Sequence, residues 1–180
     1  GEVRITFHPV KKMNPVKMLE RGKVNSIQGT SIVGSLPEDI AKRQANSAKK
    51  TLVEKGFPDA QIEKKVVSTA SPGTSITLWA NCDNSKLGSD TIGERGKPAE
   101  KVGEEAAIEL IKSIESNSAL DKWMGDQIIP FLGLSDNSEV TLEEITTHCR
   151  TNIMVTEKLL EVKFTITDNK ISVNGINFNQ

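Results

Sequence analysis

Two stripes of apolar residues at helical spacing, separated by strand-like patterns, constrain the fold of this chain most strongly. Residues that recur every three or four positions share one face of a helix, so each stripe predicts an amphipathic helix packed on a core. The stripes are Ala41, Ala45, Ala48 and Leu52, and then Val102, Ala106, Leu110 and Ile114. The first helix is expected to begin at a capping box, Ser35 to Glu38, and to stop at Gly56. The second is expected over 98–116.

Alternation of apolar and polar residues predicts strands before, between and after these helices. The expected strands cover 2–7, 24–33, 62–69, 75–82, 87–92, 139–142, 162–166 and 171–173. Turn residues separate several of them, including Ser71-Pro72-Gly73 and the Asp168-Asn169 pair of a closing hairpin. Strands interleaved with four helices predict an α+β fold, in which each sheet is covered by helices.

The composition is that of a rather polar globular chain. Of the 180 residues, 36% are hydrophobic and 26% are charged, and the formal net charge is −1. The sequence shows no signal-peptide pattern, no apolar run long enough to span a bilayer, and two distant cysteines that match no metal spacing. A cytoplasmic protein with no membrane partner is therefore expected. Six lysines and arginines lie before residue 25, and they form either a basic surface that binds phosphates or an ordinary solvated loop.

The stretch 139–160 carries one of the two histidines. It is interpreted as a short strand, a polar turn and a helix over 153–160, with Thr151 or Asn152 as the helix cap. This arrangement places His148 beside a helix N-terminus, where an anionic ligand is favoured. The alternative is a structural histidine at the end of a strand.

A further helix is expected over 118–134. Its apolar stripe would consist of Leu120, Met124, Ile128 and Phe131. Pro130 should bend or end this helix. Trp123, Asp126 and Gln127 form a neighbouring ridge at i, i+3 and i+4. An indole, a carboxylate and an amide suit a planar ring and a ribose, whereas the alternative is an ordinary ridge with a partly buried tryptophan.

The usual motifs for phosphate loops, zinc hydrolysis, dithiol redox chemistry and serine hydrolysis are absent from the sequence. The loop 93–100 places Gly93 and Gly96 around a charge pair just before a helix. Its backbone amides could approach a phosphate, but a tight connection from strand to helix is the favoured interpretation. His8 ends an expected strand beside a proline, and a structural role is favoured for it.

Four stretches, taken together and in order, resemble the RNA 3′-terminal phosphate cyclase family, in its archaeal type. They are SPGTSITLWA at 71–80, GERGKPAEKVGEEAA at 93–107, DKWMGDQIIPFL at 121–132 and THCRTNIMVTEKLL at 147–160. The resemblance implies an enzyme that uses ATP and a divalent metal, Mg or Mn, to convert an RNA 3′-phosphate end to a 2′,3′-cyclic phosphate. Such an enzyme is a ligase that releases AMP and pyrophosphate.

The resemblance also implies roles for particular residues. His148 matches the family's histidine nucleophile, which would attack the α-phosphate of ATP and carry AMP. The family's nucleotide-binding segment maps onto Trp123, Met124, Gly125, Asp126 and Gln127, with Trp123 as the platform for adenine. The alternative on the same scaffold is a non-catalytic RNA-binding or ribosome-assembly protein, which would bind RNA without forming an adenylate.

The layout implied by the resemblance is a large domain of repeated βαβαββ-like units that carries a smaller inserted α/β domain. Residues 1–20 with 119–180 would form the last unit of the large, catalytic domain, and 21–118 the insert. Gly1-Glu2-Val3 looks like the end of the family's glycine-rich signature. Earlier units, with further RNA and ATP contacts, are therefore expected before Gly1, and the chain by itself is expected to be incomplete as an enzyme.

Overall fold

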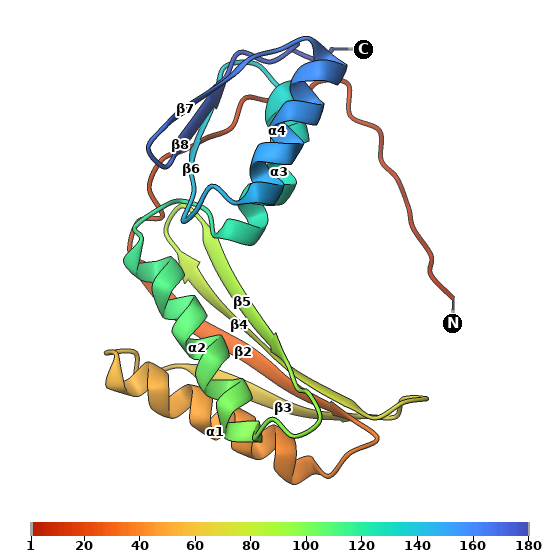
Figure 1. The fold of residues 1–180 in the computed structure, drawn as a ribbon, viewed down its shortest axis with the longest axis vertical. Coiled ribbons are helices and arrows are strands. Elements are labelled where there is room, and N and C mark those ends of the chain that lie inside the picture. Colours follow the sequence, from red (N-terminus) through yellow and green to blue (C-terminus); the bar gives the residue numbers. More distant parts are fainter. Residues whose placement is uncertain (1, 180) are drawn as a thin grey trace. The chain divides into compact units, whose positions relative to one another are not determined.

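The computed structural model describes residues 2–179 and shows an α+β fold (Figure 1). By its internal contacts the chain divides into two compact units, one formed by 2–19 with 122–179 and the other by 20–121. Each unit contains one four-stranded sheet and two helices. The α+β class predicted from the interleaved patterns is confirmed.

The unit formed by 20–121 is built on a sheet with the strand order β3-β2-β4-β5. Its strands are β2 (Val24–Gly34), β3 (Gln61–Val67), β4 (Gly73–Cys82) and β5 (Lys86–Ile92). β2 runs parallel to β3 and antiparallel to β4, and β4 runs antiparallel to β5. All four strands were predicted from alternation, with boundaries that differ by one or two residues.

Two helices, α1 (Glu38–Glu54) and α2 (Ala99–Glu115), cover one face of this sheet (Figure 1). The predicted stripes of both helices are buried. Ala48, Leu52 and all four residues of the second stripe share one apolar cluster with inward-facing strand residues such as Leu78. Gly103 permits the close approach of the helices, because a Cβ atom there would lie 2.0 Å from the backbone oxygen of Gln44. The stripes therefore predicted the core of this unit correctly.

The predicted capping box at Ser35 is wrong. Pro37 occupies the N-cap position of α1, and no side chain caps the helix. Ser35 has a positive φ of 51°, and its Oγ donates to the backbone oxygen of Thr69 at 2.8 Å. The hydroxyl is therefore engaged by the connection between β3 and β4, which the local sequence pattern does not reveal. Gly56 follows the helix with φ +91°, as expected for a stop signal.

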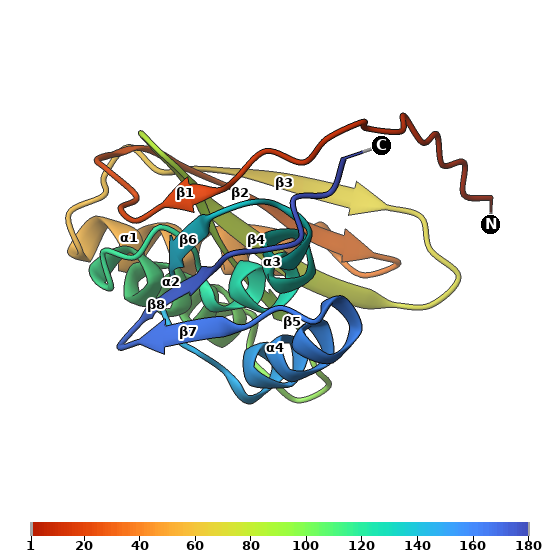
Figure 2. The same ribbon diagram turned by 90° about the horizontal axis from the view of Figure 1, so that it is seen from above.

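The other unit contains a sheet with the order β1-β6-β8-β7. Its strands are β1 (Lys17–Met18), β6 (Ser138–Thr141), β7 (Phe164–Thr167) and β8 (Lys170–Val173). β7 and β8 form the predicted closing hairpin, with Asp168 at φ 54° in the turn (Figure 2). β1 pairs parallel to β6, an arrangement that the sequence did not predict. The helices α3 (Lys122–Leu134) and α4 (Thr147–Leu160) pack side by side (Figure 1 and Figure 2).

The strand predicted over 2–7 does not form. Val3, Ile5 and Phe7 alternate with polar residues, but their exposed fractions are 84%, 65% and 82%. A strand needs a neighbour that accepts and donates backbone hydrogen bonds, and no strand described within 2–179 pairs with this segment. Alternation alone was therefore an insufficient signal.

The boundaries and the buried face of α3 also differ from the prediction. The helix begins at Lys122 rather than 118. Two residues of the predicted apolar stripe, Met124 and Phe131, are exposed. The buried positions are instead Gly125, Ile129, Leu132 and Gly133. The face is shifted because the two glycines let Leu142 and the side chains of α4 approach the helix closely.

Pro130 does not end α3, which continues to Leu134. Proline lacks an N–H group, so the backbone oxygen of Asp126, four residues earlier, loses its helical donor. The side chain of Asn152 in α4 replaces that donor, since its Nδ2 donates to the Asp126 oxygen at 2.5 Å. A donor from another helix thus explains how the proline is accommodated.

Candidate functional site

The N-terminus of α4 is set by Thr146. This residue is the N-cap, in an extended conformation, and its Oγ1 accepts a hydrogen bond from the backbone N–H of Cys149 at 3.0 Å. The prediction that Thr151 or Asn152 caps the helix is therefore wrong, and both lie inside α4. The polar turn expected after Thr146 is the first part of the helix itself.

His148 is the second residue of α4, and its side chain is exposed. The backbone N–H groups of the first helical residues have no acceptor within the helix, and the helix dipole places partial positive charge there. The first turn of α4 contains no acidic residue. His148 therefore lies where an anionic group such as a phosphate would be stabilised. This placement agrees with the sequence-based expectation, although the helix begins earlier than predicted.

The neighbouring thiol is unsuited to act as a nucleophile. Cys149 is fully buried. Burial, with a smaller contribution from the negative charge of Asp126, raises the pKa of this thiol to about 11, against the opposing effect of Arg150. The thiol is thus protonated near neutral pH, and the reactive form is the thiolate. His148, by contrast, is exposed in this turn.

Asp126 joins α3 to the start of α4. Thr146 donates its hydroxyl proton to Oδ1 of Asp126 while it accepts from Cys149. The backbone oxygen of the same aspartate accepts from Asn152. The residue therefore fixes the end of the helix that carries His148, so its carboxylate has a structural partner in addition to the ligand contact that the resemblance implies.

The remaining residues of the predicted ridge divide into exposed and packed positions. Trp123 and Met124 are 53% and 42% exposed, and Gln127 is also exposed. The Nζ atom of Lys122 lies 5.1 Å from the centroid of the Trp123 ring, within the range of a cation–π contact. Gly125 is buried, and a Cβ atom there would lie 2.9 Å from Cδ1 of Leu142. Trp123 and Gln127 can meet a ligand, whereas Gly125 serves helix packing.

Sequence reasoning missed Thr146 and Asn152 as the residues that position the site. Thr146 was detectable, because threonine is a preferred N-cap and stands two residues before His148. Asn152 was not detectable in this role, since its partner depends on how α4 packs against the proline-containing helix.

The loop 93–98 lies in the other unit and forms a connection between β5 and α2. The N–H of Gly93 donates to Thr74 at 2.8 Å, and the N–H of Lys97 donates to Glu94 at 3.1 Å. Gly96 adopts a positive φ of 87°. These two amides are already bonded within the protein, which supports the favoured interpretation of the loop as a strand-to-helix connection.

Neither a metal cluster nor a membrane helix is found among the described residues. Residues 2–179 contain no group of three or more His, Cys, Asp or Glu side chains placed to hold a metal ion. None of the helices within the same range has the length and apolarity required to cross a bilayer.

Fold and site together define an α+β protein with a solvent-facing histidine in the first turn of α4, a helix that is hydrogen-bonded to α3. Residues 19–115, more than half of the chain, match the sequence profile of the insert domain of RNA 3′-terminal phosphate cyclase (RTC). The chain belongs to the RNA 3′-terminal phosphate cyclase family.

Curated relatives extend the similarity beyond the insert domain. The chain is 40% identical to the RNA 3′-terminal phosphate cyclase of Thermococcus gammatolerans, over 92% of this chain and 48% of that protein. It is 43% identical to the protein of the same name from Methanosarcina barkeri, again over 92% of this chain and 48% of the relative. The match to the Caldivirga maquilingensis cyclase is 38% identical over 98% of this chain and 52% of the relative. The chain spans about half the length of these relatives.

Proposed function

We propose that this protein acts on RNA 3′-phosphate ends, and that it forms the 2′,3′-cyclic phosphate at the expense of ATP with His148 as the adenylylated nucleophile. The observation that carries the proposal is the position of His148, exposed in the first turn of α4 beside a buried and protonated Cys149. Relatives that are about 40% identical and bear the cyclase name support the reaction class.

In the proposed first step, a ring nitrogen of neutral His148 attacks the α-phosphorus of ATP. A nitrogen–phosphorus bond forms as the bond to the bridging oxygen breaks, and pyrophosphate leaves. Imidazole is a competent nucleophile near neutral pH because much of it is unprotonated there. The N-terminus of α4 and the exposed Arg150, which has no carboxylate partner among the described residues, would stabilise the charge that develops on the phosphate.

In the second and third steps, the RNA 3′-phosphate oxygen attacks the adenylate, which releases His148 and forms a phosphoanhydride. The adjacent 2′-OH then attacks the RNA phosphorus, loses its proton and displaces AMP. During the first transfer Trp123 would offer an aromatic face to the adenine, and Gln127 a hydrogen-bonding amide. Both side chains are exposed, as a binding role requires.

The test is transfer of label from α-labelled ATP to the purified full-length protein, with Mg²⁺ or Mn²⁺ present. The expected product is a protein-bound label that is released by acid, as a phosphoramidate would be. His148→Asn should abolish the label, whereas His8→Asn provides a matched control because His8 is the second histidine and is also exposed.

Two results would contradict the proposal. Undiminished labelling of the His148→Asn variant would remove His148 from its role. RNA binding by the wild-type protein without any covalent label would instead favour the non-catalytic RNA-binding alternative.

A further inference from the structure

A single residue of α3 is bound by α4 at two points. Oδ1 of Asp126 accepts the hydroxyl proton of Thr146, and the backbone oxygen of Asp126 accepts a hydrogen bond from Nδ2 of Asn152 at 2.5 Å. Thr146 is the N-cap of α4, and Asn152 lies in the second turn of the same helix. We call these three residues the clamp, because together they fix the first part of α4 against α3.

The clamp lies between the groups that the proposed reaction brings together. Trp123 and Gln127 are three positions before and one position after Asp126 on α3. His148 is four positions before Asn152 on α4, so these two side chains share a face of that helix. The proposed adenine platform and the proposed nucleophile therefore each lie within about one helical turn of the clamp.

The hydroxyl of Thr146 has two partners at once. It donates to Asp126 on α3 and accepts from the backbone N–H of Cys149 at 3.0 Å within α4. One hydroxyl thus caps the helix that carries His148 and ties the start of that helix to α3. Removing this hydroxyl would release both contacts, whereas buried apolar residues such as Ile129 would still pack α3 against the rest of its unit.

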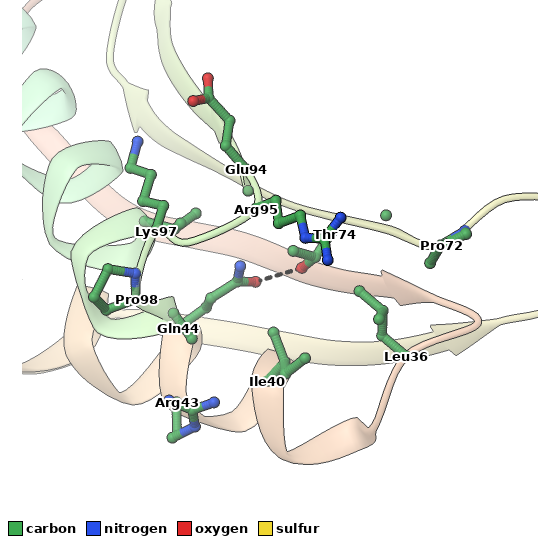
Figure 3. Close-up of a pocket in the computed structure, with 14 residues that line it drawn as sticks. Leu36, Ile40, Arg43, Gln44, Pro72, Thr74, Glu94, Arg95, Lys97 and Pro98 are labelled. Atoms are coloured by element: carbon green, nitrogen blue, oxygen red, sulfur yellow. Dashed lines mark hydrogen bonds between the residues drawn. The ribbon is translucent and has the colours of Figure 1, made fainter.

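Two other helices show that a helix of this chain begins without such a contact. α1 and α2 start after Pro37 and Pro98, and no side chain caps either helix. Pro98 borders a cavity of about 520 Å³ rather than a hydrogen-bonding partner (Figure 3). The side-chain cap of α4 and its tie to α3 therefore supply a precision of placement that helix formation alone does not require.

We propose that Thr146 is a positioning residue for the transfer of AMP from ATP to His148. Acting through Asp126, and together with Asn152, it sets the distance and direction between the ring of His148 and an ATP molecule bound on α3. The inference rests on the proposed function, and it identifies what aligns the first step. A nucleophile must lie about 3–3.5 Å from the atom that it attacks, and a displacement of about 1 Å slows a reaction by about a hundredfold. Thr146 makes no contact with ATP in this arrangement, so its loss should slow the transfer without weakening the binding of ATP.

The test measures the rate of label transfer from α-labelled ATP to the full-length protein, in a single turnover and over a range of ATP concentrations. Thr146→Val keeps the size of the side chain and removes its hydroxyl. We expect the maximal rate to fall by about tenfold to a hundredfold. The ATP concentration that gives half of this rate should change by less than about threefold, since ground-state binding is retained. Thr146→Ser keeps the hydroxyl and should recover most of the rate.

Three further variants separate positioning from stability and from binding. Ile129→Val removes one buried methyl group of α3 outside the clamp, so it should lower the stability measured by urea unfolding and leave the maximal rate unchanged. Asn152→Ala removes the other bond of the clamp and should slow the transfer in the same way, and it is the second test if Thr146→Val fails to fold. Trp123→Ala should instead raise the ATP concentration needed for half of the maximal rate.

Three results would overturn the inference while the wild-type protein still takes up label, which leaves the proposed function standing. They are a wild-type maximal rate in either clamp variant, an equal loss of rate in Ile129→Val, and a loss in Thr146→Val that a higher ATP concentration restores. A wild-type protein that takes up no label would overturn the proposed function and this inference with it.

Discussion

The pairing of Asn152 with the carbonyl that Pro130 leaves free leads to a prediction about stability. In Asn152→Ala the backbone oxygen of Asp126 loses its donor, because Pro130 cannot supply one. A lost hydrogen bond costs about 0.5–1.5 kcal/mol, and leaving the acceptor unsatisfied costs about 1–3 kcal/mol. Asp126 and Asn152 are only half-buried, so water reaches part of the site. We expect a loss of about 1–2 kcal/mol in the free energy of unfolding.

A double-mutant cycle separates this explanation from a general effect of the alanine. Pro130→Ala restores an N–H group that can bond to Asp126 within α3, so Asn152→Ala should then cost less than about 0.5 kcal/mol. Each unit has one of the two tryptophans, so urea unfolding followed by Trp123 fluorescence in a Trp79→Phe background reports on this unit. Equal losses in the two backgrounds would refute the reasoning.

Two further predictions concern a buried thiol and a close helix contact. Burial raises the pKa of Cys149 to about 11, so the folded state binds the thiol proton more tightly than the unfolded state. The contribution of this thiol to stability should therefore be lost as the pH rises from about 9 to about 11. In urea titrations at several pH values, Cys149→Ala should reduce that pH dependence. Gly103→Ala would place a methyl group 2.0 Å from the backbone oxygen of Gln44, so we expect the free energy of unfolding to fall by about 1–3 kcal/mol and the Tm to fall with it. Gly73→Ala is the control and should cost far less, because a Cβ atom there meets no atom within 4 Å.

Much of the core could be predicted from the sequence because burial imposes its own spacing. Leu52 and Leu110 lie on stripes that can face only a core, and both are fully buried against one sheet. The hairpin around Asp168 was also predictable from local sequence, since a pair of turn residues between two alternating segments favours a hairpin. These features depend on residues close together in the chain.

The errors share a dependence on distant partners. The Ser35 hydroxyl could have capped α1, but it bonds to Thr69, and that choice depends on the path of the connection after β3. Residues 2–7 alternate well, yet no described strand pairs with them. The buried face of α3 is set by Gly125 and Leu142, whose contact the helical spacing cannot show.

The candidate site was predictable in kind and not in detail. His148 was expected at a helix N-terminus and lies in the first turn of α4, but Thr146 rather than Thr151 provides the cap. The exposure of Trp123 fits the expected platform, whereas the contact of Asp126 with Thr146 arises from packing between α3 and α4. The chemical roles of His148 and Trp123 stay predictions, to be decided by the labelling experiment.

Two polar groups illustrate packing contacts that only the folded chain can supply. In the unit with α3, the carbonyl of Asp126 loses its helical donor to Pro130, and Asn152 replaces that donor from within the protein. In the other unit, the hydroxyl of Ser35 likewise bonds to a distant partner, the backbone oxygen of Thr69, at 2.8 Å. A folded chain satisfies nearly all of its buried donors. Both contacts join segments that are distant in the sequence, which is why no local sequence pattern predicted them.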